Sequence, residues 1–450
     1  MSSTPLYDAL RAFAGAEPLR MHMPGHKGKP LPLPELAGFA ALDVTELPPT
    51  GDLYAGGGPI EAAEALWARV FHFFHCFFLT GGSTQGVHTA LALACRPGEQ
   101  VLLDRGCHRS AFHALALLDL YPVFLERPWL SGPGVAGPIA PEELERQLSL
   151  HPGIKTVCIT SPTYYGVLSD IPTLARIAHA HGAVLAVDAA HGAHLPFLGD
   201  YALSAADLAV VSAHKTLPAP GQTALLFSSA AFDPARVRRT AALFGTSSPS
   251  FPFLAALDAT RAWMEEEGGA AYRRAAERTA SLRAYYPALT PVDAPLDPTR
   301  FVLRSPDGFA DQDRLAAQGI YPEMADRGHV VFILSCADGP SEFARLRAGL
   351  DALPRGECAF PPPPPLPQAV LSPRQALFAP AEALALSQCV GRILAQQVAP
   401  YPPGIPVAAP GERLEKKTVA YLNDIGYNMR EEVQVVRGSV CSAEGRPGFT

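Results

Sequence analysis

Lys215 is the residue whose position points most directly to chemistry. The stretch 208–216 (LAVVSAHKT) begins as an apolar strand pattern and then brings His214 and Lys215 in succession. A lysine at such a strand end is costly to desolvate unless it is paired, covalently linked or reactive. The reactive case is a Schiff base between the lysine amine and an aldehyde. The alternative is an ordinary lysine whose amine reaches solvent.

Asp188 ends the preceding predicted strand, in the stretch 183–194 (AVLAVDAAHGAH), and His191 and His194 follow it closely. A carboxylate at a strand end can pair with a protonated pyridine nitrogen. The segment between Asp188 and Lys215 has about the length of a crossover between parallel strands. The two side chains are therefore expected at neighbouring strand ends. A helix cap or a turn would also explain the aspartate.

A glycine-rich turn precedes a predicted helix at 85–95. It reads LTGGSTQG (79–86) and contains Gly82, Ser83 and Thr84. Small residues let backbone N–H groups approach a phosphate, and the N-terminus of a helix favours its negative charge. The turn matches neither GxGxxG nor a Walker loop, which argues against dinucleotides and nucleoside triphosphates.

Together these features describe one site, with a phosphate cradle, a partner for a pyridinium nitrogen and a Schiff-base lysine. These are the contacts that pyridoxal 5′-phosphate (PLP) needs. His108, in CHRS (107–110) after another predicted strand, is expected to stack on the cofactor ring. A capping or surface role would also account for this histidine. No histidines have convincing metal-ligand partners, so we expect no metal.

Strands must carry these residues to one edge of a sheet. Short and nearly continuous apolar runs indicate strands buried on both faces. The predicted strands are 100–104, 121–125, 156–160, 183–188 and 208–212. The predicted helices are 60–71, 85–95, 109–118 and 171–181. This alternation predicts an α/β fold with a mostly parallel sheet, and such sheets bind ligands at the carboxyl ends of their strands.

Changes in composition divide the rest of the chain. Residues 253–286 predict a long helix, which Gly268–Gly269 could interrupt, leading into a smaller domain. The run FPPPPPLP (360–367) favours polyproline II and is interpreted as a linker. The predicted parts are an N-terminal arm (1–50), a large PLP-binding domain (51–289), a small domain (290–357), a Pro-rich linker (358–367) and a C-terminal domain (368–450).

The bulk composition excludes several classes of protein. The chain has 450 residues, 48% hydrophobic and 18% charged, which is typical of a globular protein with two or three domains. Its net charge of −7 gives no basic surface for nucleic acid. Eight scattered cysteines without a CxxC pair indicate a reducing compartment. No signal peptide is evident and no apolar run could cross a membrane, so we expect a cytoplasmic protein.

Nine stretches, taken together, resemble one known family. They are MHMPGHKG (21–28), DVTELPPTGDLYAGGGPI (43–60), GGSTQG (81–86), CHRS (107–110), SPTYYGVLSD (161–170), VDAAHGAH (187–194), SAHKT (212–216), IYPEMAD (320–326) and PYPPGIPVAAPGE (400–412). The family is the Orn/Lys/Arg decarboxylases, PLP enzymes of fold type I. The resemblance implies an aspartate-aminotransferase-like large domain, a smaller α/β domain and a C-terminal α+β domain.

The resemblance also implies roles for individual residues. The implied cofactor contacts are Gly82, Ser83, Thr84, His108, Asp188, His191, Ser212, His214 and Lys215. Ser83, Thr84, Ser212 and His214 would hold the phosphate. His108 would stack on the ring, Asp188 would pair with its nitrogen, and Lys215 would form the Schiff base. Gly81 stands where many members have Asn, which would loosen the phosphate loop, and the start near PGHKG suggests the short form without an N-terminal wing domain.

The expected reaction is α-decarboxylation of arginine, lysine or ornithine, which gives CO₂ and an amine for polyamine synthesis. The expected catalytic residues are Lys215, Asp188, His108 and His214. The residues that hold PLP are shared with aminotransferases, lyases and oxidases, so another PLP reaction is an alternative. A non-catalytic regulatory paralogue is a second alternative, against which the complete set of PLP residues argues.

The substrate side is expected to hold a carboxylate, because a buried distal cation without a partner would be penalised. Glu323 is the preferred partner, with Asp326 and Asp52 as alternatives, and Tyr164 would line the pocket. Loops such as the one near Asp52 reach a neighbouring subunit in this fold, so we expect a homodimer or a larger homo-oligomer. Lys27 is a rival lysine, but it lies in a Pro/Gly-rich turn of the predicted arm.

Overall fold

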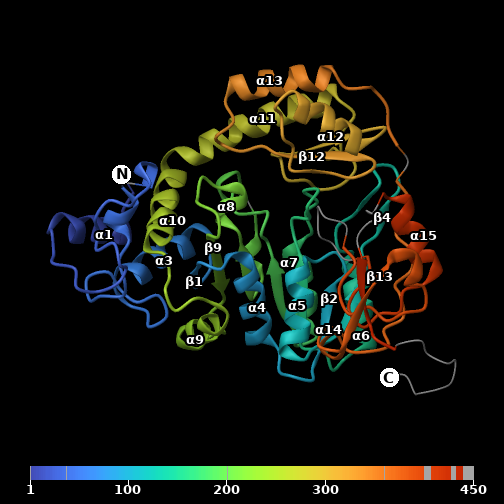
Figure 1. The fold of residues 1–450 in the computed structure, drawn as a ribbon, viewed down its shortest axis with the longest axis horizontal. Helices are drawn as coiled ribbons and strands as arrows, with labels where there is room; N and C mark the ends of the chain where they lie inside the picture. The colour runs from blue at the N-terminus through green and yellow to red at the C-terminus, as the bar shows by residue number, and fades with distance from the viewer. Residues whose placement is uncertain are drawn as a thin grey trace.

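The computed structural model describes residues 2–36, 38–199, 201–358, 360–399, 407–426 and 432–438. Its large domain is built on a seven-stranded sheet with the order β1-β9-β8-β7-β6-β2-β3 (Figure 1). The strands in this order are β1 (His75–Leu79), β9 (Ala224–Ser228), β8 (Leu208–Val211), β7 (Val184–Asp188), β6 (Thr156–Thr160), β2 (Gln100–Asp104) and β3 (Tyr121–Leu125). Strand β9 is antiparallel to both neighbours, and the other neighbouring pairs are parallel. The predicted, mostly parallel α/β sheet is confirmed.

Three of the predicted strands, at 100–104, 121–125 and 156–160, are confirmed at both ends. The other two are each one residue shorter, because Ala183 and Ser212 lie just outside β7 and β8. The sequence analysis assigned no strand to β1 or β9. These two strands complete the edge of the sheet beyond β8.

Apolar residues of successive strand positions cover both faces of the sheet. In β8, Leu208 and Val210 belong to one core cluster, whereas Ala209 and Val211 belong to the other. The helices packed on the first face are α4 (Gly82–Ala94), α5 (Arg109–Leu118) and α9 (Pro234–Phe244). The helices packed on the second face are α3 (Gly58–Val70), α6 (Pro141–Leu150) and α7 (Ile171–Ala180).

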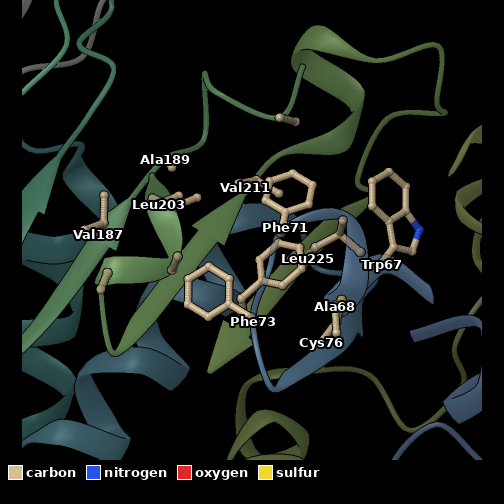
Figure 2. Close-up of a cluster of buried hydrophobic side chains, with 14 of the residues drawn as sticks. Trp67, Ala68, Phe71, Phe73, Cys76, Val187, Ala189, Leu203, Val211 and Leu225 are labelled. Atoms are coloured by element: carbon tan, nitrogen blue, oxygen red, sulfur yellow. The ribbon is translucent and has the colours of Figure 1, made fainter. Parts of the chain in front are cut away.

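Figure 2 shows aromatic packing on the second face, where Phe71 and Phe73 lie beside Val211 and Leu225. The ring of Phe71 stacks on Phe227 with a centroid distance of 4.4 Å. This packing holds strands β8 and β9 in place on the second face of the sheet. The residues that follow β8 are therefore attached to a well-packed strand.

Helix α4 lies unusually close to the sheet on the first face. A Cβ atom at Gly86 would fall 2.5 Å from Val210 Cγ1 and 2.9 Å from Leu79 Cδ1. Only glycine therefore lets the first turns of α4 approach β8. This approach brings the glycine-rich turn next to the end of the strand.

A long helical segment leads from the large domain to the small domain. It consists of α10 (Phe251–Trp263), a π-helical turn (Met264–Gly268) and α11 (Gly269–Tyr285). The α-helix is interrupted near the expected position, because a π-helical turn ends at Gly268 and α11 begins at Gly269, but the helical path continues through the turn. The small domain has an antiparallel sheet of β10 (Arg300–Arg304), β12 (His329–Ile333) and β11 (Met324–Ala325), with α12 (Gly308–Ala317) and α13 (Pro340–Asp351). Figure 1 shows it above the sheet edge where α8 (Ala213–Thr216) lies.

The C-terminal part has α14 (Pro373–Leu377), β13 (Ala381–Ala385), α15 (Lys416–Asp424) and β14 (Glu432–Val436). Residues 360–367, the predicted linker, form neither helix nor strand. Residues 400–406 of the PYPPGIP motif lie outside the described residues. The N-terminal part contributes α1 (Pro5–Gly15) and α2 (Phe39–Leu42). Within the described ranges, no helix has the length and apolarity that a membrane span requires.

Candidate active site

Lys215 lies in α8, the single helical turn that follows β8. Its Nζ is 3.2 Å from His191 Nε2. Burial lowers the pKa of the Lys215 amine, and the nearby charge of Asp188 opposes this shift. A lowered pKa raises the fraction of neutral amine, which is the nucleophilic form.

Asp188 ends β7, the strand next to β8, as its spacing from Lys215 predicts. The side chain is 6% exposed, and its Oδ1 accepts a hydrogen bond from the Ala190 N–H at 3.1 Å. Its Oδ2 has no hydrogen-bond partner within the described part of the chain. Burial raises the pKa of Asp188, while the Lys215 charge lowers it. A buried carboxylate with one unused oxygen is suited to a cationic partner such as a protonated ring nitrogen.

His191 connects Lys215 with the small domain. Its Nδ1 is 3.4 Å from Arg300 Nη2, and its ring meets the Tyr164 ring edge-on with a centroid distance of 4.7 Å. The side chain is buried, and burial together with the Lys215 and Arg300 charges holds the pKa of His191 well below its ordinary value. The imidazole is therefore neutral at physiological pH.

His108 is the N-cap of α5, and its Nδ1 accepts hydrogen bonds from the Ser110 N–H at 3.2 Å and the Ser110 hydroxyl at 2.9 Å. Burial lowers the pKa of His108 to about 4, and the positive charge of Lys215 adds to this shift. The capping alternative of the sequence analysis is thus also met. A neutral ring held by its cap near Lys215 is suited to stacking on a flat cofactor.

The glycine-rich turn and the lysine turn meet through one short segment. The Gly82 N–H donates to the Gln222 carbonyl at 2.9 Å, and His214 Nδ1 donates to the Thr223 carbonyl at 2.8 Å. Gly82 has a φ of +66°, a conformation that glycine adopts without strain. The start of α4, with Ser83 half-buried, therefore lies beside α8.

Two buried hydroxyls near Lys215 have no hydrogen-bond partner in the described chain. They are Ser212 Oγ and Thr216 Oγ1, one on each side of the lysine in sequence. A buried hydroxyl without a partner costs free energy, so each is suited to a ligand that accepts hydrogen bonds. Hydroxyl donors and the N–H groups at a helix start, such as that of α4, are the kinds of donor that suit a phosphate.

Glu323 precedes β11 in the small domain, and the Tyr164 hydroxyl donates to its carboxylate. The Glu323 charge acts to raise the pKa of Lys215. Asp326 is already occupied, because it accepts from the Tyr165 hydroxyl and from two backbone N–H groups. Glu323 is thus the better placed of the two carboxylates.

Other candidates lie apart from this cluster. Lys27 Nζ is exposed and donates to the His22 carbonyl, and Asp52 Oδ1 accepts from the N–H groups of Tyr54 and Ala55. In the described residues, no group of three or more His, Cys, Asp or Glu side chains could hold a metal ion.

Two important residues carried no signal that the sequence analysis used. Arg300 begins β10 and reaches His191 across the domain boundary. Asp104, fully buried at the end of β2, forms an ion pair with Arg127 at 2.6 Å and accepts from the Thr160 N–H at 3.0 Å. The strand-end position of Asp104 was visible, but its partners were not.

The residues that meet at the ends of β7 and β8 fit PLP. A carboxylate for the ring nitrogen, a partly buried amine and unpartnered hydroxyl donors are all present. The fold and this arrangement define a PLP enzyme of fold type I. Solved structures agree on the fold: the constitutive lysine decarboxylase of Escherichia coli superposes with a TM-score of 0.80 at 20% identity, covering 96% of this chain and 81% of that one. A NifS-like protein gives a TM-score of 0.53 at 16% identity, covering 67% of this chain and 91% of that one.

Residues 4–290 match the major domain of the Orn/Lys/Arg decarboxylases, and residues 362–430 match the C-terminal domain of that family. The chain therefore belongs to the Orn/Lys/Arg decarboxylase family, whose members are PLP-dependent carbon–carbon lyases. It is 31% identical to the protein YaaO of Bacillus subtilis, over 96% of each chain. It is 28% identical to an arginine decarboxylase of Bacillus subtilis, over 93% of each chain.

Proposed function

We propose that this protein uses PLP to remove the α-carboxylate of a basic amino acid, giving an amine and CO₂. The observation that carries the proposal is the partly buried Lys215 amine beside Asp188, with the unpartnered hydroxyls of Ser212 and Thr216 next to it. Family membership supports the reaction class.

The proposed cofactor contacts rest on the hydroxyl groups without hydrogen-bond partners and on the neutral imidazole rings. Ser212, His214 and the start of α4 with Gly82, Ser83 and Thr84 would hold the phosphate. Asp188 would hold the ring nitrogen, His108 would cover a ring face, and Lys215 would bind the aldehyde carbon. When bound, PLP supplies an electron sink for the electrons of the breaking Cα–carboxylate bond.

Side chains of the protein would then donate the proton that Cα needs after CO₂ has left. Lys215 Nζ is the amine that would bind the cofactor, and it lies 3.2 Å from His191 Nε2. His214 uses Nδ1 to donate to the Thr223 carbonyl, so its Nε2 is the atom free for proton exchange. Lys215 Nζ and His214 Nε2 are the two proposed donors of the proton that replaces CO₂ on Cα.

Glu323 is the proposed partner of the distal cation of the substrate, with Tyr164 orienting its carboxylate. Relatives that align over more than 90% of this chain include arginine decarboxylases from two Bacillus species, at 28% identity. We therefore propose arginine as the first substrate to test, ahead of lysine and ornithine. Polyamine synthesis is the proposed use of the product.

We further propose a homodimer in the cytoplasm. Apolar side chains of the N-terminal part, Leu19, Met21 and Met23, are 88%, 80% and 60% exposed, which is costly in an isolated chain. The seven cysteines within the described ranges are all free, which suits a reducing compartment.

The test is an absorbance spectrum of the purified protein with PLP, followed by detection of CO₂ and amines from separate arginine, lysine and ornithine incubations. Lys215→Ala is expected to lose the absorbance of lysine-bound PLP and at least a thousandfold in turnover, roughly 4 kcal/mol of barrier. Lys155→Ala, which removes an exposed lysine at the far end of β6, is the matched control. Full turnover by Lys215→Ala would disprove the proposal. A keto acid as the product, in place of an amine and CO₂, would show that the protein catalyses a different PLP reaction.

A further inference from the structure

Arg300 is a buried arginine of the small domain that reaches into the site of the large domain. It is the first residue of β10 and is 1% exposed. Its backbone and side chain are packed against Gly166, where a Cβ atom would fall 2.7 Å from Arg300 Cβ. Arg300 therefore has a fixed position, from which Nη2 lies 3.4 Å from His191 Nδ1.

This contact determines which nitrogen of His191 carries the proton. A guanidinium only donates hydrogen bonds, so His191 Nδ1 must be the acceptor. The neutral imidazole consequently has its hydrogen on Nε2, the atom 3.2 Å from Lys215 Nζ. His191 then donates to Lys215, and the lysine amine accepts with its lone pair. A protonated lysine has no lone pair and would place two donors against each other.

The charge of Arg300 acts in the same direction. Within the described residues it makes no ion pair, and its Nε and Nη1 are buried without a hydrogen-bond partner. The buried carboxylate of Asp297, whose charge acts on Arg300, pairs with His194 at 3.0 Å. Asp297 and Glu323 act on the guanidinium through their charges without forming an ion pair with it. The guanidinium is a permanent positive charge, and it lowers the pKa of both His191 and Lys215.

The groups that face Lys215 come from several elements. Asp188 on β7 and Glu323 before β11 favour its charged form, whereas Arg300 on β10 disfavours it. His108 is partly buried and His191 is buried, and the pKa values of both are lowered, so neither adds a positive charge at neutral pH. Arg300 is thus the permanent cation that balances the two carboxylates.

We propose that Arg300 is a positioning residue that keeps Lys215 in its neutral, PLP-reactive form, by holding His191 with its proton on Nε2 and by placing a fixed positive charge beside the pair. The assignment rests on the proposed role of Lys215. It explains why a buried arginine is left without a carboxylate partner.

The first test measures the ionisation of Lys215 in the full-length protein without PLP. Competitive acetylation at a series of pH values, read by mass spectrometry of the peptide that contains Lys215, gives its pKa. Arg300→Gln removes the charge and is expected to raise the midpoint by about one pH unit, whereas Arg300→Lys keeps it close to the wild-type value. Arg304→Gln, at the other end of β10, is the matched control and is expected to leave the midpoint unchanged.

The second test follows the capture of PLP by the same proteins, which needs the neutral amine. At pH 7, Arg300→Gln is expected to bind PLP about tenfold more slowly, with the pH profile displaced upward by the same unit. Nitrogen-15 spectra of histidine-labelled wild-type protein, assigned with His191→Asn, are expected to show the proton on Nε2. An unchanged Lys215 midpoint in folded Arg300→Gln, or a proton on His191 Nδ1, would overturn the inference. The absorbance of lysine-bound PLP in Lys215→Ala would instead overturn the proposed function, and the acetylation result would still stand.

Discussion

Glu412 and Arg105 form a buried ion pair that ties the C-terminal part of the chain to the active-site loop. Arg105 Nη1 and Nη2 donate to the two carboxylate oxygens at 2.8 and 2.9 Å, and the side chains are only 10% and 3% exposed. The guanidinium also lies 4.4 Å from the Phe124 ring centroid. Since Arg105 is three residues before His108, this pair anchors the loop that carries the proposed stacking ring.

Removing one charge of this pair leaves the other buried and unpaired, which costs about 3–5 kcal/mol. We therefore expect Glu412→Gln to open the contact locally, and to increase amide exchange at Ala408, Ala409 and Leu414 by about a hundredfold to a thousandfold. Hydrogen–deuterium exchange of peptides from 407–424 and 105–118 measures the effect on both sides of the contact.

Glu382→Gln is the matched control for this experiment. It removes a carboxylate that pairs with Arg392 on a more exposed surface of the same C-terminal part. Exposed pairs contribute little, so exchange in 407–424 should change by less than about fivefold. Equal exchange in Glu412→Gln and wild-type protein would show that the pair does not hold the two parts together.

Two further predictions concern the site itself. Glu323→Gln is expected to raise KM for the basic substrate by about 10- to 100-fold with a smaller change in kcat, because a neutral amide cannot pair with the distal cation. Glu357→Gln on the same domain is the control. Equal KM values for Glu323→Gln and the wild-type protein would show that Glu323 is not part of the substrate site. The folded pKa of His108 is about 4, so the unfolded chain binds more protons between about pH 6.5 and pH 4, and stability falls as pH falls through this range. Urea unfolding without PLP measures the free energy of unfolding at each pH. Between about pH 6.5 and pH 4 this free energy is expected to fall by up to about 3 kcal/mol less in His108→Gln than in the wild-type protein. Identical pH profiles of the two proteins would contradict the cause given for the pKa shift.

Much of the catalytic sheet could be predicted because its strands are continuous apolar runs that end in polar residues. The strand ending at Asp104 is predicted at both ends, and Asp188 and Lys215 follow adjacent strands as their spacing requires. The strands β1 and β9 were missed although β9 is fully buried. Its antiparallel pairing with β8 follows from a short return segment rather than from a helical crossover, and only the alternation with helices was used to find strands.

Pairs that join distant segments could not be predicted from one sequence. Arg105 and Glu412, or His191 and Arg300, are far apart in the chain, and neither member of a pair indicates its partner. Burial makes these pairs decisive, but burial at such positions depends on the tertiary fold. The polar residues at the strand ends could therefore be predicted from the sequence. The distant residues that anchor their loops or change their pKa values could not.

The distribution of charge in the site has a consequence for the substrate. The imidazoles of His108 and His191 have lowered pKa values and are neutral, and the amine of Lys215 also has a lowered pKa. The carboxylates that remain open come from different domains: Asp188 from β7 with a free Oδ2, and Glu323 from the segment before β11. One carboxylate suits a ring nitrogen, and the other suits a cation carried by the substrate. A substrate with a neutral side chain would leave Glu323 without a charged partner, so the site should discriminate against it when both domains enclose the ligand.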